Sequence, residues 1–295
     1  MKKLALIFLL ICACGQQGVP MPQDIATGTI AVEPSFVNPP SSIIMCQQAN
    51  ILARLSNKGT SDVTRGVYTF IVEDQVLYAP KKSDTFQLEG KSKFNPQGGI
   101  QQLQFSVKNT GLPPQLESYS TPIILQACYP YETFSTTTVC IDPDVQNTNP
   151  NKVCRPSTVS VGGQGAPVAV TRVEPIMEPI QDSVTPSFII SIANLGNGKV
   201  ISSNDAQAAC TTKQPLKGTV QVMADLQAEP LICQPEAITL ESGKEAKVKC
   251  TAQGYSGKEQ GTYQTLLSVT LNYGYVTNTI LPITITKIPG QEECT

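Results

Sequence analysis

The sequence predicts an all-β chain of two tandem antiparallel β-sandwich domains, preceded by an export signal and a flexible tether. Three observations support this prediction. Short segments alternate apolar and polar residues between Gly, Pro, Asn and Ser clusters, as half-buried strands do. No long amphipathic helical segment follows the N-terminal region. Finally, similar patterns recur in both halves of the chain, which indicates a duplicated domain.

The N-terminus has the form of an export signal. Lys2 and Lys3 precede an apolar run, 4–13, that is shorter than the roughly 20 residues a membrane-spanning helix needs. A charged start and a short apolar run are typical of a signal peptide, here 1–13. The ending "ICAC" resembles the lipobox of exported lipoproteins, which implies that Cys14 is lipidated and anchors the chain on the extracytoplasmic face of the membrane. The alternative is a plain secreted protein.

A tether and two domains are expected after the signal. Residues 14–28 are rich in Gln, Gly and Pro, as flexible tethers are. The first sandwich is predicted at 29–160, a Gly-rich linker at 161–167 and the second sandwich at 168–290, with a short tail at 291–295. The evidence for duplication is that "ILARLSNKG" matches "FIISIANLG", and that "YPY" matches "YGY".

Composition excludes several classes of site. The chain has no histidine, so neither a Ser-His-Asp nor a Cys-His catalytic arrangement can form. No CxxC pair is present, which argues against structural zinc. Basic residues are not clustered, which argues against nucleic acid as a partner. No phosphate-binding glycine loop occurs. We therefore expect no cofactor and no enzymatic activity, although carboxylates that converge from distant positions remain an alternative.

Two stretches carry a resemblance to a known family. "FIISIANLGNG" and "ILARLSNKG" resemble a strand and turn of immunoglobulin-like adhesion domains of the CARDB type, found in prokaryotic surface proteins. "ACYPYETFSTTTVCIDPD" is similar to cysteine-paired surface proteins of archaea. The resemblance covers about a fifth of the chain. It implies immunoglobulin-like sandwiches, a surface location and a structural or adhesive role.

Eight cysteines remain after Cys12 leaves with the signal and Cys14 is set aside. An even number in an exported chain predicts four disulfides, although eight cysteines allow 105 pairings. By analogy with the inter-sheet bond of immunoglobulin domains, we expect Cys46 to pair with Cys128. Short separations favour two more bonds, and elimination leaves the last. These three are Cys140–Cys154, Cys233–Cys250 and Cys210–Cys294.

Two groups of residues are candidates for binding a ligand. The loop between Cys140 and Cys154 holds four oxygen-bearing side chains suited to calcium, although a solvated turn is the favoured interpretation. These candidates are Asp142, Asp144, Asn147 and Asn149. Four tyrosines could stack on a sugar, although cross-strand pairing is favoured. They are Tyr129, Tyr131, Tyr273 and Tyr275.

These inferences favour an exported, membrane-anchored, non-enzymatic envelope module. Its expected partners are the membrane, through Cys14, and an envelope protein or polysaccharide. One alternative is a solute- or polysaccharide-binding lipoprotein, although no alternation of strands and helices suggests a two-lobed binding protein. The other is a carboxylate-based secreted hydrolase, which would need a concave site with raised carboxyl pKa values.

Overall fold

The computed structural model describes residues 26–113, 115–180, 183–211, 216–241, 243–253, 261–288, 290 and 294. The predicted signal peptide, Cys14 and most of the tether and tail lie outside the described residues. The described chain is all-β, with two short 3₁₀ turns, η1 (Ser203–Asp205) and η2 (Ala208–Cys210). In that part of the chain no helix is long and apolar enough to cross a membrane.

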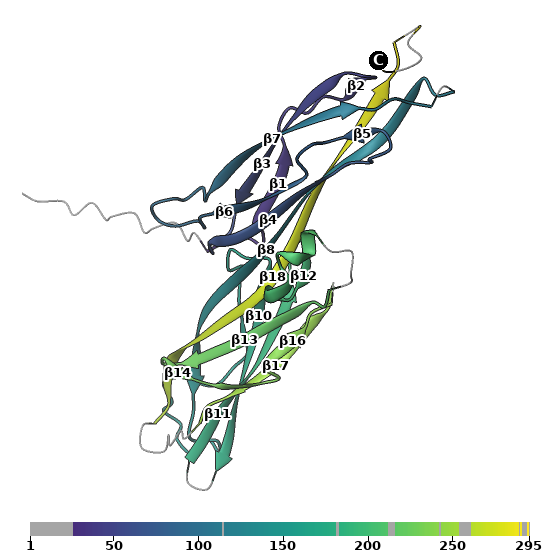
Figure 1. Ribbon diagram of the computed structural model, residues 1–295. Coiled ribbons are helices and arrows are strands. Elements are labelled where there is room, and N and C mark those ends of the chain that lie inside the picture. Colours follow the sequence, from purple (N-terminus) through teal and green to yellow (C-terminus); the bar gives the residue numbers. More distant parts are fainter. Residues whose placement is uncertain are drawn as a thin grey trace, which may run out of the picture.

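Two lobes form an elongated molecule (Figure 1). One layer of lobe 1 is a four-stranded antiparallel sheet in the order β1-β3-β7-β5. One layer of lobe 2 is a five-stranded antiparallel sheet in the order β15-β17-β11-β10-β9. The strands are β1 (Val32–Phe36), β3 (Gln48–Asn57), β5 (Leu77–Tyr78), β7 (Ile100–Asn109), β9 (Val159–Ser160), β10 (Val168–Ile180), β11 (Ser183–Asn194), β15 (Ile232–Gln234) and β17 (Glu245–Thr251).

A nine-stranded sheet, here called the long sheet, provides the second layer of both lobes. Its main order is β14-β13-β18-β8-β4-β6, and three short strands, β2, β12 and β16, pair at its sides. Only β2 runs parallel to its partner. The strands are β2 (Ser42–Ile44), β4 (Val63–Ile71), β6 (Ser83–Leu88), β8 (Ser118–Ile141), β12 (Lys199–Ile201), β13 (Thr219–Leu226), β14 (Glu229–Pro230), β16 (Ala237–Thr239) and β18 (Tyr263–Thr286).

Alternating sequence places the core between the layers. In β13, Val220, Val222, Ala224 and Leu226 are buried, and the residues between them are more exposed. This period of two is the reason that the segment forms a one-sided strand. In lobe 1 the two layers meet where Phe70 of β4 stacks on Phe105 of β7, with ring centroids 4.0 Å apart.

Strands β8 and β18 join the lobes. Each has 24 residues, and they pair antiparallel over their whole length, with Pro130 opposite Gly274 at the midpoint. The first half of β8 pairs with β4 in lobe 1, and its second half continues into lobe 2. The first half of β18 pairs with β13 in lobe 2, and its second half continues into lobe 1, where it pairs with β2. Each lobe therefore receives its last long strand from the other half of the sequence.

The expected domain boundaries are corrected by this pairing. Cutting between 29–160 and 168–290 would separate β8 from β18 and remove an inner strand from each lobe. The duplication itself remains visible, because β1 and β10 each pair with the next long strand, β3 and β11 respectively. A repeat pattern specifies each copy's strands but not which copy completes which sandwich, since both arrangements use the same local sequences.

The disulfide framework agrees with two of the four expected bonds. The structure contains Cys140–Cys154 and Cys233–Cys250. The expected Cys46–Cys128 and Cys210–Cys294 bonds are wrong, because Cys46 bonds to Cys294 and Cys128 bonds to Cys210. The exchange of strands explains the error: the end of β18 returns to lobe 1, which brings Cys294 to the turn that follows β2.

Candidate interaction surface

The four tyrosines form a closed ring at the waist between the lobes. Tyr131 lies opposite Tyr273 across the β8–β18 ladder, and Tyr129 lies opposite Tyr275. Neighbouring ring centroids are 5.8–6.2 Å apart around the ring. All four side chains are buried, which rules out the sugar-stacking platform and confirms the cross-strand pairs. Burial raises the pKa of Tyr129, Tyr131, Tyr273 and Tyr275.

Hydrogen bonds tie each tyrosine to its own sequence repeat. The Tyr129 hydroxyl accepts a bond from the Val32 N–H (3.1 Å), and the Tyr273 hydroxyl accepts one from the Val168 N–H (3.4 Å). Val32 and Val168 stand in β1 and β10, which are matching strands of the two copies. Equivalent bonds therefore attach the middle of β8 to β1 and the middle of β18 to β10.

The Asn-x-Gly turns of the repeat anchor the other two tyrosines. Tyr131 donates its hydroxyl proton to Asn57 Oδ1 (3.2 Å), and Tyr275 donates to Asn194 Oδ1 (3.0 Å). Each of these oxygens also accepts the N–H of the residue two positions later, Gly59 or Gly196. A Cβ atom at either glycine would collide with the tyrosine hydroxyl beside it, which explains the glycine in both copies.

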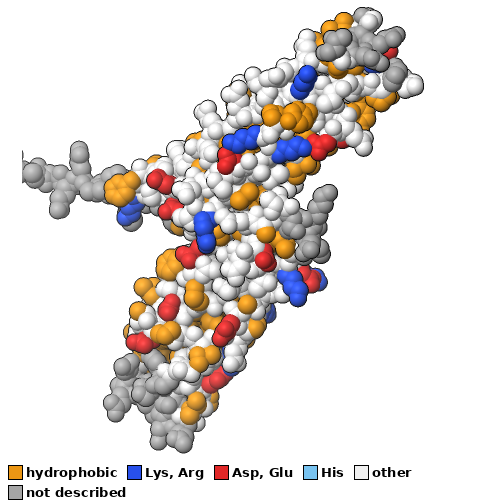
Figure 2. Space-filling model, in the orientation of Figure 1, with side chains coloured by type: hydrophobic (Ala, Val, Ile, Leu, Met, Phe, Trp, Pro, Cys, Tyr) orange, Lys and Arg blue, Asp and Glu red, His pale blue; other side chains and the backbone are white. Residues whose placement is uncertain are grey.

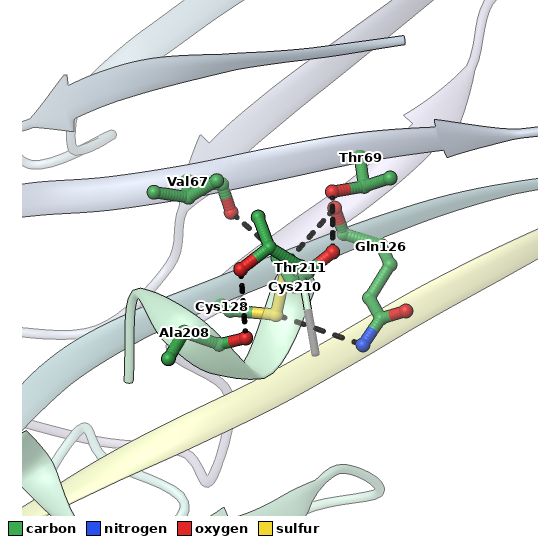
Figure 3. The surroundings of a disulfide bond; sticks show 7 residues. All are labelled: Val67, Thr69, Gln126, Cys128, Ala208, Cys210 and Thr211. Atoms are coloured by element: carbon green, nitrogen blue, oxygen red, sulfur yellow. Dashed lines mark hydrogen bonds between the residues drawn. A yellow bond between two sulfur atoms is a disulfide. The ribbon is translucent and has the colours of Figure 1, made fainter. Parts of the chain in front are cut away.

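A disulfide also links the two lobes at the waist, beside the long sheet (Figure 3). Cys128, near the middle of β8, bonds to Cys210 in the short segment between β12 and β13. The Cys210 carbonyl accepts a hydrogen bond from Thr69 Oγ1 (3.0 Å) in β4. A segment of lobe 2 is thereby fastened to lobe 1, in addition to the two shared strands.

The candidate calcium loop is organised by a lysine. Lys152 Nζ donates to Asp142 Oδ2 (2.6 Å), to the Asp144 carbonyl (2.7 Å) and to Asn147 Oδ1 (2.9 Å). Its side chain is 1% exposed. Three of the four candidate residues thus converge on an ammonium group in the position that a cation would take. Asn149 does not join them, because its side-chain oxygen accepts the Asn151 N–H.

The charged groups of this loop are held by hydrogen bonds and ion pairs. The backbone N–H groups of Asn149 (2.8 Å) and Thr148 (3.0 Å) hold the pKa of the Asp144 carboxyl well below its usual range. Burial acts to lower the pKa of Lys152, but the hydrogen bonds to Asp142 and Asp144, together with the negative charges of both carboxylates, raise it above its usual value. The sequence pattern showed the oxygen groups but not the lysine between them, although Lys152 lies only two residues before Cys154.

The outward face of the long sheet is poor in charge. Strands β8 and β18 contain a single charged residue, Glu132. In lobe 1, three isoleucines form a row across adjacent strands, Ile71 opposite Ile124 and Ile124 opposite Ile280. Ile280 is 59% exposed.

A second apolar group lies on the same face in lobe 2. Phe134 and Met223 both stand opposite Thr270, on either side of it, and are 57% and 52% exposed. Leu266 lies four residues before Thr270 on β18, on the same face of the strand, and is 58% exposed. Figure 2 shows hydrophobic side chains spread over both lobes, with acidic and basic groups among them. We call the outward groups Ile71, Ile124, Ile280, Phe134, Met223 and Leu266 the sheet-face patch.

Sequence reasoning did not find this patch. Its signal was present, because "PIILQ" in β8 and "TILPI" in β18 place apolar residues on both sides of a strand. A strand with one solvated face alternates apolar and polar residues instead. The pattern in these two segments therefore leaves apolar side chains on the outward face as well as in the core.

Comparisons with known proteins identify no family. No family model matches the chain, and no curated protein matches it. Among solved structures, the crystal structure of the YadV chaperone matches over 85% of this chain and 100% of its own, at 9% identity and a TM-score of 0.21. A similarity at this TM-score carries no weight for fold or function.

Proposed function

We propose that this chain is a non-enzymatic, lipid-anchored module of the cell envelope that binds another envelope component through the sheet-face patch. The patch carries the proposal, because it places an exposed apolar group of each lobe on the same face of the long sheet, and grouped exposed apolar side chains mark docking sites. Four disulfides in the described chain support an oxidising, extracytoplasmic location. The partner is an envelope protein or polysaccharide, and Cys14 attaches the chain to the membrane.

We also propose that each lobe is an immunoglobulin-like sandwich of the CARDB type with an exchanged final strand. In such folds one sheet contains the first, second and fifth strands, and the other contains the third and the last two. In lobe 1, β1-β3-β7 and β4-β8-β18 follow this order. In lobe 2, β10-β11-β17 and β13-β18-β8 do the same.

Crosslinking on intact envelopes tests the binding role. A photoreactive residue at Phe134 or Ile280 should crosslink to one defined envelope component. The matched control is Ile100, which is 52% exposed but lies on β7, outside the long sheet. The variants Phe134→Lys and Ile280→Lys should abolish co-purification of that component, whereas Ile100→Lys should not.

Other outcomes would contradict the proposal. Equal crosslinking from all three positions would show that the patch is not a specific binding face. Strong thermal stabilisation by one small metabolite, rising with its concentration, would favour a solute-binding lipoprotein instead. Hydrolysis of an envelope polysaccharide, lost on substitution of two carboxylates, would favour the hydrolase.

Fractionation tests the anchor independently. The chain should sediment with membranes, and Cys14→Ser should release it into the soluble fraction. Retention of the Cys14→Ser variant in membranes would refute the lipid anchor.

A further inference from the structure

A tight turn on the loop between β6 and β7 presents an aromatic side chain to solvent. The Ser92 N–H donates to the Asn95 carbonyl (3.0 Å), and the Asn95 N–H donates to the Ser92 carbonyl (3.2 Å). Lys93 and Phe94 therefore occupy the two central positions of the turn. Phe94 is 99% exposed, the most exposed of the large hydrophobic residues in the described chain. Turn tips usually carry Gly, Asn, Asp or Pro, so an aromatic residue here needs another explanation.

The tip of this turn carries a cationic side chain. Lys93 is exposed beside Phe94. Two carboxylates lie at the base of the loop, where Asp62 accepts the Gly90 N–H (2.6 Å) and Glu89 accepts a hydrogen bond from the Asn95 side chain (3.3 Å). An aromatic ring next to a lysine suits the bilayer interface, where the ring enters the headgroup region and the ammonium meets lipid phosphates.

Backbone hydrogen bonds place this loop beside the start of the described chain. The Lys91 N–H donates to the Gly59 carbonyl (2.7 Å), and the next residue, Thr60, donates to the Gly165 carbonyl (3.0 Å). Gly165 in turn donates its N–H to the Gly28 carbonyl (3.2 Å). The base of the aromatic loop and Gly28 are thus joined through two short segments at the waist. Figure 1 shows the β6–β7 loop projecting sideways from lobe 1 at this level.

Distance along the chain then limits how far this region lies from a lipid anchor. Gly28 lies fourteen positions after Cys14, and a fully extended chain of that length spans about 50 Å at most. An anchor at Cys14 therefore keeps Gly28, and the loop joined to it, within about 50 Å of the bilayer, so the Ser92–Asn95 turn can reach the lipid surface.

We propose that the Ser92–Asn95 turn docks on the phospholipid surface, with Phe94 entering the headgroup region and Lys93 contacting lipid phosphates. This inference rests on the proposed anchor at Cys14. The turn supplies the second, weaker attachment that orients the molecule, because a tethered site acts at high effective concentration.

Tryptophan fluorescence tests the proposal directly, since the chain contains no tryptophan. Full-length Phe94→Trp, exported by cells and purified in detergent, is reconstituted into vesicles of phosphatidylcholine and phosphatidylglycerol with brominated acyl chains. The control is Tyr78→Trp, an exposed aromatic position on β5 outside the sheet-face patch. We expect blue-shifted emission and strong bromine quenching for the tryptophan at 94, and neither for that at 78. Adding Lys93→Gln, or omitting phosphatidylglycerol, should reduce the quenching.

Flotation of the same vesicles separates the two hypotheses. A chain that floats with the vesicles while its tryptophan at 94 is quenched no more than that at 78 refutes the docking turn and leaves the anchor intact. A chain that does not float with the vesicles refutes the anchor, and this inference with it.

Discussion

Removal of one tyrosine hydroxyl at the waist should destabilise both lobes together. Tyr129→Phe deletes the acceptor of the Val32 N–H and leaves the ring in place. Val32 is fully buried, at 0% exposure, so no water can replace the lost partner. The substitution therefore tests a single hydrogen bond between an exchanged strand and β1.

The size of the effect follows from this geometry. Leaving one buried backbone donor without a partner costs about 1–3 kcal/mol. We expect the same direction but a smaller effect from Tyr273→Phe, because its bond to the Val168 N–H is longer, at 3.4 Å, although its hydroxyl also contacts Thr133. Tyr78→Phe is the control, since Tyr78 is 55% exposed, and it should change the free energy of unfolding by less than about 0.5 kcal/mol.

Urea unfolding followed by far-UV circular dichroism, with disulfides intact, measures these changes. Because β8 and β18 pass through both lobes, we expect one cooperative transition whose midpoint falls in both buried variants. Two separate transitions, each moved by only one variant, would refute the exchanged-strand arrangement. An unchanged midpoint in Tyr129→Phe would refute the role assigned to its hydroxyl.

Further predictions concern the disulfides, the loop and the turns. Mass spectrometry of non-reduced peptides should recover a Cys128–Cys210 link, and a Cys46–Cys128 peptide would contradict the strand exchange. The folded pKa of Asp144 lies below its usual value of 3.8, so its stabilising effect is present above that pH and is lost as the pH falls further. The Tm of Asp144→Asn should accordingly depend less on acid than that of the unchanged chain, and equal dependence would contradict this. Gly196→Ala should lower the free energy of unfolding by about 1–3 kcal/mol through overpacking, measured by the same urea assay, because the new methyl group meets Pro167 Cβ at 2.6 Å.

Some features follow from the sequence because their causes are local. Alternation of apolar residues in β3 and β13 predicts one-sided strands, since the period of two is a property of the extended chain. The Cys140–Cys154 bond follows from a short separation along the chain. The two Asn-x-Gly turns follow from their sequence as well, and Asn57 and Asn194 make the same contacts in them.

Other features depend on contacts between distant segments. No local pattern shows whether the second half of β8 stays in lobe 1 or enters lobe 2. The reason is that the two copies offer similar neighbouring strands for it to pair with. The pairing of Cys46 with Cys294, 248 residues away, follows only from that crossing. Likewise, the oxygen atoms of the Cys140–Cys154 loop suggested calcium until their arrangement in space showed Lys152 between them. The strands and the short disulfides thus follow from neighbouring residues. Which strands share a lobe depends instead on the packing of segments far apart in the chain.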